Sequence, residues 1–305
     1  MKKIIVLILA NLLMTLTACK SDGTHEASPR EARSAEQIVA HNATIGENET
    51  LIVEANGTLE ISEGATLTVK GILKCAEGGS IKVLGDIVIE GSMELGGTLT
   101  IEETGTISGG TLTVLNSFDD IDCMGSVTSE IIPPEPITEN GVTTVGGILL
   151  VNKVYSLPED YGGELDSGAY AAWVRMKEET GYDFTLLSGY RSYQRQQELF
   201  DYWVEQDGYE AALMESALPG RSEHQSGLAM DVGKLEYEYA HTDEGIWLAE
   251  NCHKYGFIIR YPEDKTEITG YIYEPWHIRY LGESTAKLVH DSGLTLEEFL
   301  KVDKQ

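Results

Sequence analysis

Two segments in the C-terminal half of the chain carry residue types that could bind a metal ion and activate water. The first segment contains His224 and Asp231, and the second contains Glu274 and His277. Two imidazoles and one carboxylate can fill three corners of a zinc tetrahedron and leave the fourth for water. The further carboxylate, Glu274, could take a proton from that water. The pattern predicts a hydrolase in which His224, Asp231 and His277 bind Zn²⁺.

We expect short strands to carry two of these ligands and a loop to carry the third. Asp231 ends the apolar run 228–230, which is typical of a buried strand, and we expect His277 to come from a second strand. His224 falls on a loop that contains Gly227. The sequence contains neither HExxH nor HxxEH, so the helical ligand arrangements of the common zinc peptidases are excluded.

The surrounding sequence predicts a mixed α/β domain over residues 148–305. Its helices carry recognisable start and stop residues, because Ser, Thr and Asp side chains cap helix N-termini and Gly ends helices. We expect strands at 184–187 and 257–259. We expect helices at 170–179 before Gly181, from Ser192 to about 205, from Thr242 or Asp243 to 255 before Gly256, at 284–290, and after a capping box of Thr295 with Glu298.

Residues 45–115 have a different sequence pattern, in which pairs of apolar residues are separated by a single residue. Apolar pairs begin at 81, 87, 93 and 99, a spacing of about six, and Gly-Thr-Leu recurs at 57–59, 97–99 and 110–112. This spacing favours an all-β, solenoid-like module over a β-sandwich, whose strands usually recur every 8–12 residues. Residues 116–147 contain Pro133, Pro134 and Pro136 and are typical of a linker.

The N-terminus has the pattern of an export signal. Lys2 and Lys3 precede the apolar run 4–16, which is shorter than a membrane-spanning helix. The run ends in Leu-Thr-Ala-Cys, which resembles the lipobox of bacterial lipoproteins and implies a signal peptide over 1–18 and a lipid on Cys19. We therefore expect a lipid-anchored protein at the extracytoplasmic face of the bacterial cell membrane, with a polar tether over 19–44.

Charge and cysteine content exclude some partners. The net charge of -28 argues against nucleic acid, which requires a basic patch, and against electrostatic adhesion to anionic lipid. Three cysteines remain besides Cys19, so at least one thiol should be free; a Cys75–Cys123 bridge and the pairing of Cys252 stay open. We expect a monomer.

The second domain resembles the VanY-type D-alanyl-D-alanine carboxypeptidases. The resemblance rests on the motifs at 149–161, 188–192 (Ser-Gly-Tyr-Arg-Ser), 222–231 (SxHxxGxAxD) and 274–277 (ExxH), and it covers about 149–282. It implies an α+β fold of the Hedgehog/DD-peptidase type. It also implies zinc ligands at the three residues named above and a general base at Glu274.

The resemblance further implies a substrate site. Arg191 matches the family's substrate arginine, and its planar guanidinium suits a carboxylate or a developing oxyanion. Ser222 and Gln196 match positions that hold the terminal carboxylate of the peptide, although Gln196 could equally be a solvent-facing helix residue. The implied activity is removal of the C-terminal D-alanine from peptidoglycan stem peptides. An L,D-carboxypeptidase acting on tetrapeptide stems and a non-catalytic wall-binding lipoprotein remain alternatives.

Overall fold

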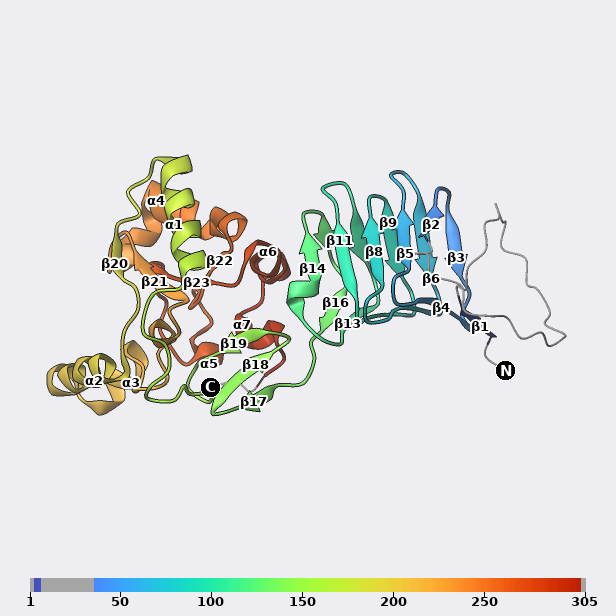
Figure 1. Cartoon of the computed structure of the whole chain (residues 1–305). Coiled ribbons are helices and arrows are strands. Elements are labelled where there is room, and N and C mark those ends of the chain that lie inside the picture. The colour runs from blue at the N-terminus through green and yellow to red at the C-terminus, as the bar shows by residue number, and fades with distance from the viewer. Residues whose placement is uncertain (1–2, 7–35, 303–305) are drawn as a thin grey trace.

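The computed structural model describes residues 3–6 and 36–302, which form a β-solenoid followed by a mixed α/β domain (Figure 1). The solenoid has three faces, and each is a sheet of parallel strands stacked along its axis. The first sheet contains β1 (Lys3–Val6), β4 (Glu49–Val53), β7 (Ile72–Cys75), β10 (Ser92–Leu95), β13 (Thr111–Val114) and β16 (Glu130–Ile132). The second contains β2 (Glu36–Val39), β5 (Thr58–Ile61), β8 (Ser80–Val83), β11 (Thr98–Ile101) and β14 (Ile121–Cys123). The third contains β3 (Ala43–Ile45), β6 (Thr66–Val69), β9 (Asp86–Ile89), β12 (Thr106–Ser108) and β15 (Ser126–Val127).

The spacing of six residues is the separation between the starts of successive strands from β8 to β11, which lie on successive faces. Asp86 pairs with Thr66 on one side and with Thr106 on the other, so one turn of this sheet takes 20 residues. Most strands from β5 to β13 alternate half-buried and buried residues, and the buried ones point into the solenoid. The predicted solenoid is therefore confirmed, and the β-sandwich alternative is wrong.

Glycines allow the corners of successive turns to stack closely. A Cβ at Gly105 would lie 2.2 Å from the carbonyl oxygen of Val83, and a Cβ at Gly125 would lie 2.2 Å from that of Gly105. These separations are far below any real contact, so only glycine fits where backbone passes over backbone. The recurrence of Gly85, Gly105 and Gly125 at one corner therefore follows from the stacking distance.

The boundaries predicted for the tether and the linker need correction. Strand β2 and the first two residues of β3 lie within the expected tether 19–44, yet these strands pair in register with β5 and β6. Strands β14, β15 and β16 lie within the expected linker 116–147 and continue the three faces. Of the expected signal segment 1–18 only Lys3–Val6 is described, as β1 beside β4, and Cys19 lies outside the described residues.

The second domain is built around a four-stranded antiparallel sheet in the order β20 (Leu186–Ser188), β21 (Ala229–Val232), β23 (His277–Tyr280), β22 (Phe257–Ile259). A separate antiparallel sheet of β17 (Ile137–Glu139), β18 (Val142–Val145) and β19 (Ile148–Leu150) precedes it. The helices are α1 (Ser167–Thr180), α2 (Tyr193–Asp207), α3 (Tyr209–Glu215), α4 (Asp243–Asn251), α5 (Thr266–Thr269), α6 (Glu283–Ser292) and α7 (Leu296–Phe299). Short 3-10 helices are η1 (Phe118–Asp120), η2 (Glu223–Ser226), η3 (Tyr237–His241) and η4 (Cys252–Tyr255).

The predicted helix boundaries are largely confirmed by their caps. The hydroxyls of Ser192 and Thr242 accept from backbone N–H groups at the starts of α2 and α4, and Gly181 ends α1 with a left-handed conformation. Thr295 and Glu298 form the expected capping box of α7. The helix expected to run to 255 instead ends at Asn251 and continues as η4.

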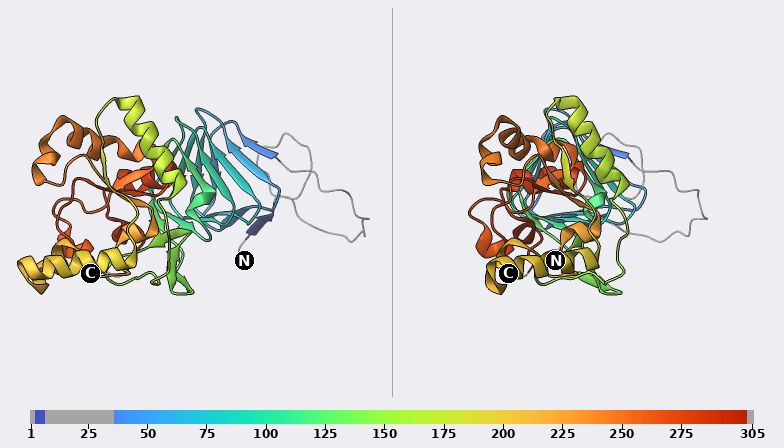
Figure 2. Two further views of the ribbon diagram at one scale, coloured as in Figure 1. Left: turned by 60° about the vertical axis from the view of Figure 1, so that its left-hand side comes forward. Right: turned by 90° about the vertical axis from the view of Figure 1, so that its left-hand side faces the viewer.

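The C-terminal helices of the second domain cover the last turn of the solenoid (Figures 1 and 2). Helix α6 lies beside β14, and the backbone N–H of Cys123 donates to the Ser284 hydroxyl at 3.0 Å. Phe118 of the solenoid packs against Phe299, with ring centroids 5.3 Å apart. One continuous apolar cluster therefore runs from the solenoid interior into the second domain.

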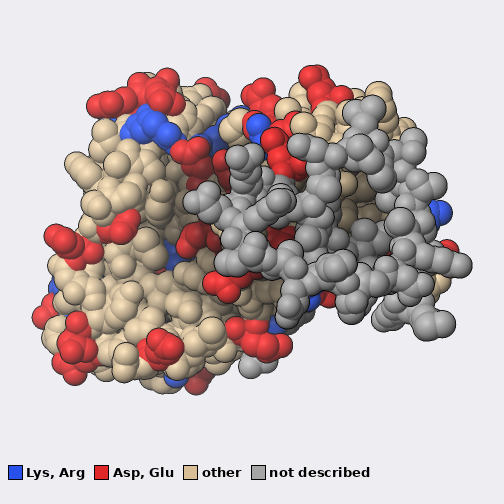
Figure 3. Space-filling model, turned by 45° about the vertical axis from the view of Figure 1, so that its right-hand side comes forward, with Lys and Arg blue, Asp and Glu red and all other residues tan. Residues whose placement is uncertain are grey.

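Acidic side chains are spread over both parts of the molecule on the face in Figure 3. Cys75, Cys123 and Cys252 are all buried and unbridged, so the Cys75–Cys123 disulfide considered from sequence is not formed. Burial raises the pKa of the Cys75 and Cys123 thiols to about 11 and that of Cys252 to about 12. Within the described ranges, no helix combines the length and apolar character needed to cross a membrane.

Candidate active site

Asp231 lies on β21, an inner strand of the four-stranded sheet, where two neighbouring strands bring partners to it. It sits opposite Ser188 of β20 on one side and opposite His277 of β23 on the other. His224 comes from η2, which ends at Gly227 in a left-handed conformation before the chain enters β21. Antiparallel pairing places opposite residues close together, so the sheet itself sets the distance between Asp231 and His277.

The three residues predicted to bind metal converge. His224 Nε2 lies 3.2 Å from Asp231 Oδ2, and His277 Nδ1 lies 3.1 Å from Asp231 Oδ1. The three donor atoms all lie within 4.8 Å of one another, and all three residues are buried. Two nitrogens and one oxygen at such separations can surround one ion and leave a further position open, which is the pattern of catalytic zinc sites.

Each histidine presents a different ring nitrogen to this point. His224 Nδ1 lies 2.7 Å from the carbonyl oxygen of Gly189, which can only accept, so Nδ1 carries the proton and Nε2 keeps its lone pair for a metal. Burial lowers the pKa of His224 and favours this neutral form. His277 is turned the other way, with Nδ1 toward Asp231 and Nε2 toward Glu223.

The electrostatics of the site favour a cation at the point of convergence. Burial alone would lower the pKa of His277, but the neighbouring carboxylates of Asp231 and Glu223 raise it to about 9. Asp231 Oδ1 is buried without a hydrogen-bond partner, which is costly unless a further group binds it. The donor types, the carboxylate charge and this unpartnered oxygen together fit a zinc ion.

Glu274 lies at the edge of the same group. It is in the tight turn before β23, where its backbone oxygen accepts from the His277 N–H, and its Oε2 lies 3.4 Å from His277 Nδ1. Burial raises the pKa of the Glu274 carboxyl to about 7, His277 opposes this rise, and Asp231 adds to it. A carboxylate with such a pKa can both accept and return a proton near neutral pH.

Arg191 points into the site from the loop after β20. Its guanidinium donates to the Ser188 hydroxyl and to Gln196 Oε1, both at 2.9 Å, and one nitrogen lies 3.6 Å from Asp231. The Gln196 amide donates to the Ser216 hydroxyl and the Ala217 carbonyl, and the residue is fully buried. Because Gln196 is buried and contacts Arg191, the solvent-facing alternative is wrong, whereas its contact with the terminal carboxylate of the peptide stays a prediction.

Ser222, Tyr190 and Trp276 each lie within two positions of one of these residues in the chain. Ser222 is buried just before η2, and its hydroxyl forms no capping bond to that helix. Tyr190 lies along a surface pocket with Glu159, Asp160, Tyr161 and Gln194. Trp276 is half-buried and packs against the ring of Tyr237, so core packing explains its aromatic character.

Sequence reasoning missed a charged cluster directly behind the site. Glu223 lies between Ser222 and His224 in the chain and contacts both Arg260 and Arg279, with all three side chains almost completely buried. Arg279 follows His277 by two positions on β23, so alternation along a strand could have placed both on one face. No pattern in the sequence around Arg260 indicates that it lies beside Glu223 and Arg279.

Comparisons with known proteins agree with this geometry. A family model described as VanY: D-alanyl-D-alanine carboxypeptidase matches residues 164–283. The chain is 38% identical over 186 residues to the putative carboxypeptidase YodJ of Bacillus subtilis, covering 52% of this chain and 68% of that protein. It is 35% identical over 187 residues to a D-alanyl-D-alanine carboxypeptidase of Enterococcus faecalis, covering 54% of this chain and 70% of that protein.

A solved structure shows the same fold. The LdcB LD-carboxypeptidase is 38% identical, with a TM-score of 0.50, over 56% of this chain and 95% of that one. The matched residues 164–283 include His224, Asp231, Glu274 and His277. The chain therefore belongs to the VanY family of D-alanyl-D-alanine carboxypeptidases.

Proposed function

We propose that this protein is a zinc carboxypeptidase that removes the C-terminal D-alanine from peptidoglycan stem peptides. The observation that carries the proposal is the convergence of His224, Asp231 and His277, with their donor atoms within 4.8 Å, beside a carboxylate whose pKa is about 7. Such a set matches the chemistry of amide hydrolysis. The relatives described as D-alanyl-D-alanine carboxypeptidases supply the substrate class.

His224 Nε2, Asp231 and His277 Nδ1 would hold the zinc ion, which acidifies a water molecule and polarises the scissile carbonyl when bound. Arg191 would bind the terminal carboxylate of the peptide through guanidinium donors, and Gln196 and Ser188 hold that guanidinium in place. Substrate orientation would therefore depend on a side chain that is fixed before the peptide arrives.

Glu274 carries out the proton transfers. Its carboxylate takes a proton from the attacking water, whose oxygen forms the new bond to the carbonyl carbon. The carbon–nitrogen bond then breaks, and Glu274 returns the proton to the departing amine of D-alanine. The products are the shortened peptide, ending in a carboxylate, and free D-alanine. The pKa of Glu274 near 7 suits both halves of this exchange.

The substitution Glu274→Gln should keep bound zinc and lower kcat by about 10²- to 10⁴-fold, because the amide cannot accept the proton. The measurement is mass spectrometry of a defined pentapeptide stem together with metal analysis of the same samples. Glu263→Gln, which alters an exposed carboxylate in the preceding loop, is the matched control and should retain the parent rate. Cleavage by Glu274→Gln at the parent rate would refute the base assignment.

A second candidate is an L,D-carboxypeptidase acting on tetrapeptide stems, with the same zinc chemistry. It is favoured by the likeness to the LdcB LD-carboxypeptidase over 95% of that chain and by a 37% identical L,D-carboxypeptidase DacB of Streptococcus with a TM-score of 0.51. Parallel digestion of pentapeptide and tetrapeptide stems separates the two. Loss of D-alanine from the pentapeptide alone supports the first proposal, and loss from the tetrapeptide alone supports the second.

We also propose that the chain is a monomeric lipoprotein, anchored through Cys19 at the extracytoplasmic face of the membrane. The apolar run 4–16 and the Leu-Thr-Ala-Cys sequence support this. Diacylglycerol on Cys19 would supply two acyl chains, enough for stable anchoring. Metabolic labelling with a fatty-acid probe should mark the parent protein but not Cys19→Ser, and detergent-solubilised protein should sediment as one chain.

A further inference from the structure

A buried carboxylate, Glu223, stands behind the proposed zinc site with only one of its two oxygens in use. Glu223 Oε1 accepts from Arg260 Nε at 2.8 Å and from Arg279 Nη1 at 2.7 Å. Its second oxygen, Oε2, is buried and lacks a hydrogen-bond partner among the described residues. A buried carboxylate oxygen without a partner is costly, so a donor is expected to reach it.

A ring nitrogen of His277 faces this oxygen. His277 Nε2 lies 3.7 Å from Glu223 Oε2, and this nitrogen is likewise buried without a partner. The opposite ring nitrogen, Nδ1, faces Asp231 at 3.1 Å. Two unpartnered atoms of complementary type thus face each other just beyond hydrogen-bond distance, and a small shift of the ring would join them.

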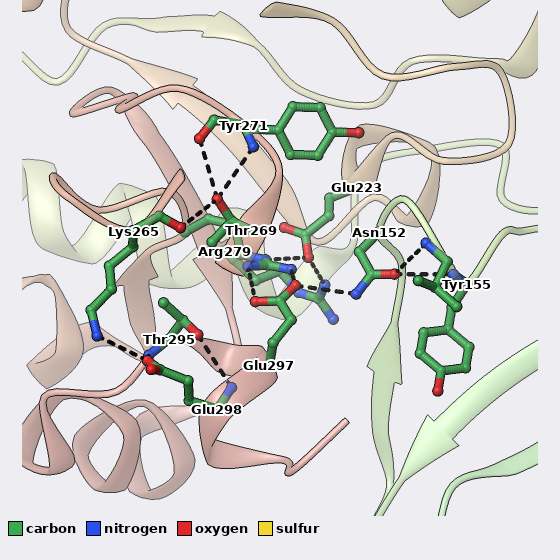
Figure 4. A network of polar contacts seen from close by, with 12 residues as sticks. Asn152, Tyr155, Glu223, Lys265, Thr269, Tyr271, Arg279, Thr295, Glu297 and Glu298 are labelled. Atoms are coloured by element: carbon green, nitrogen blue, oxygen red, sulfur yellow. Dashed lines mark hydrogen bonds and ion pairs between the residues drawn. The ribbon is translucent and has the colours of Figure 1, made fainter. Parts of the chain in front are cut away.

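Glu223 is held rigidly in this position. Arg260 donates to both oxygens of Glu297 at 2.9 and 2.5 Å, and Arg279 also donates to the Leu149 carbonyl at 2.6 Å. The Asn152 amide donates to Glu297 at 3.1 Å, and Figure 4 shows Glu223, Arg279, Glu297 and Asn152 in one network of polar contacts. The two carboxylates and two guanidinium groups balance in charge. Buried charges need such compensation, so Glu223 stays ionised. Rotating its side chain away would leave the two arginines without their acceptor, which costs free energy.

We propose that Glu223 is a positioning residue for the zinc site: its Oε2 accepts the Nε2–H of His277 and thereby keeps the Nδ1 lone pair directed at the metal. A neutral imidazole carries one ring proton, so an acceptor fixed at Nε2 selects the tautomer that leaves Nδ1 free. Such an outer carboxylate also increases the basicity of the ligating nitrogen. The inference rests on the proposed zinc site.

Zinc affinity of the metal-free protein, measured by competition with a chromogenic chelator, tests this role without any substrate. Glu223→Gln should lower the affinity by about 10- to 100-fold, as loss of an outer hydrogen bond to a histidine ligand commonly does. Glu297→Gln is the charge-matched control, since it removes the same charge from the same cluster but contacts Arg260 and not His277. Its affinity should stay within about threefold of the parent. Equal losses in both variants, or no loss in Glu223→Gln, would overturn the proposal.

A measurement on the unsubstituted protein covers the case in which Glu223→Gln does not fold. In zinc-loaded protein with ¹⁵N-labelled histidine, NMR should show His277 protonated at Nε2, with a proton that exchanges slowly with water. Protonation at Nδ1, or rapid exchange of the Nε2 proton, would contradict the proposal. Weaker zinc binding by Glu223→Gln in a protein that cleaves neither stem peptide would uphold the positioning role and reject the proposed substrate.

Discussion

At the scale of single residues, Arg191 depends on the residue behind it. Gln196 is the only residue of α2 that reaches this guanidinium within the described hydrogen bonds, and a bond to a charged group is worth about 1.5–3 kcal/mol. Gln196→Ala should therefore raise KM for the stem peptide about tenfold or more, with a smaller change in kcat. Steady-state kinetics of both variants on the stem peptide is the measurement. Gln197→Ala is the control, since Gln197 is an exposed neighbour that donates a hydrogen bond to Asp201. Similar kinetics for both variants would contradict the supporting role of Gln196.

A second residue-scale prediction concerns stability against pH. Burial, followed by the neighbouring imidazole of His290, lowers the pKa of His253 from 6.5 to about 4, although Asp291 opposes the shift. Lys254 and Lys287 also lower it, and the two imidazole rings stack with centroids 3.7 Å apart. Because only the unfolded chain binds the proton between these values, the contribution of His253 is complete above pH 6.5 and is lost as the pH falls toward 4.

The substitution His253→Gln should remove this contribution. The fall in Tm between pH 7 and pH 5 should then become smaller by a few degrees, as calorimetry would measure, since about 1 kcal/mol corresponds to about 2–4 °C in a chain of this size. His241→Gln, at the exposed end of η3, should leave the fall unchanged. An unchanged pH dependence in His253→Gln would contradict the assignment.

At the scale of elements, antiparallel strand pairing assembles the site. The pairing of β21 with β23 sets Asp231 opposite His277, and the apolar run that ends at Asp231 predicted the first of these strands. The cluster of Glu223, Arg260 and Arg279 could not, because charged residues are usually exposed and the contacts join positions far apart in the chain. Local patterns therefore predicted the proposed ligands but not the charged cluster beside them.

Helix α7 offers a test of element stability. Its capping box uses the Thr295 hydroxyl and the Glu298 carboxylate, and the helix carries Glu297 of the buried cluster. Thr295→Ala should lower the free energy of unfolding by about 1 kcal/mol, because the N-cap bond is lost. Thr128→Ala, at an exposed position of the solenoid, should change it by less than about 0.5 kcal/mol in the same urea titration. Equal stability of the two variants would show that the cap contributes nothing.

At the scale of the whole molecule, the repeat predicted the solenoid interior but not its ends. The apolar spacing is regular between Ile81 and Leu99, where each turn packs on another turn on both sides. The first and last turns depart from that spacing, and strand β14 packs partly against helix α6 of the second domain. Terminal repeats meet different neighbours, so their sequences follow different constraints.

The shared apolar cluster implies that the solenoid and the second domain unfold together. Phe118 and Phe299 meet across their boundary, and both are buried. Phe118→Ala should lower the free energy of unfolding by up to about 3–5 kcal/mol. It should also divide one calorimetric transition into two, because the contact that couples the solenoid to the second domain is removed. Phe200→Ala creates a comparable cavity in α2, away from the boundary, and should lower the stability without separating the parts. A single transition in Phe118→Ala, or a division in Phe200→Ala, would show that the coupling does not depend on this contact.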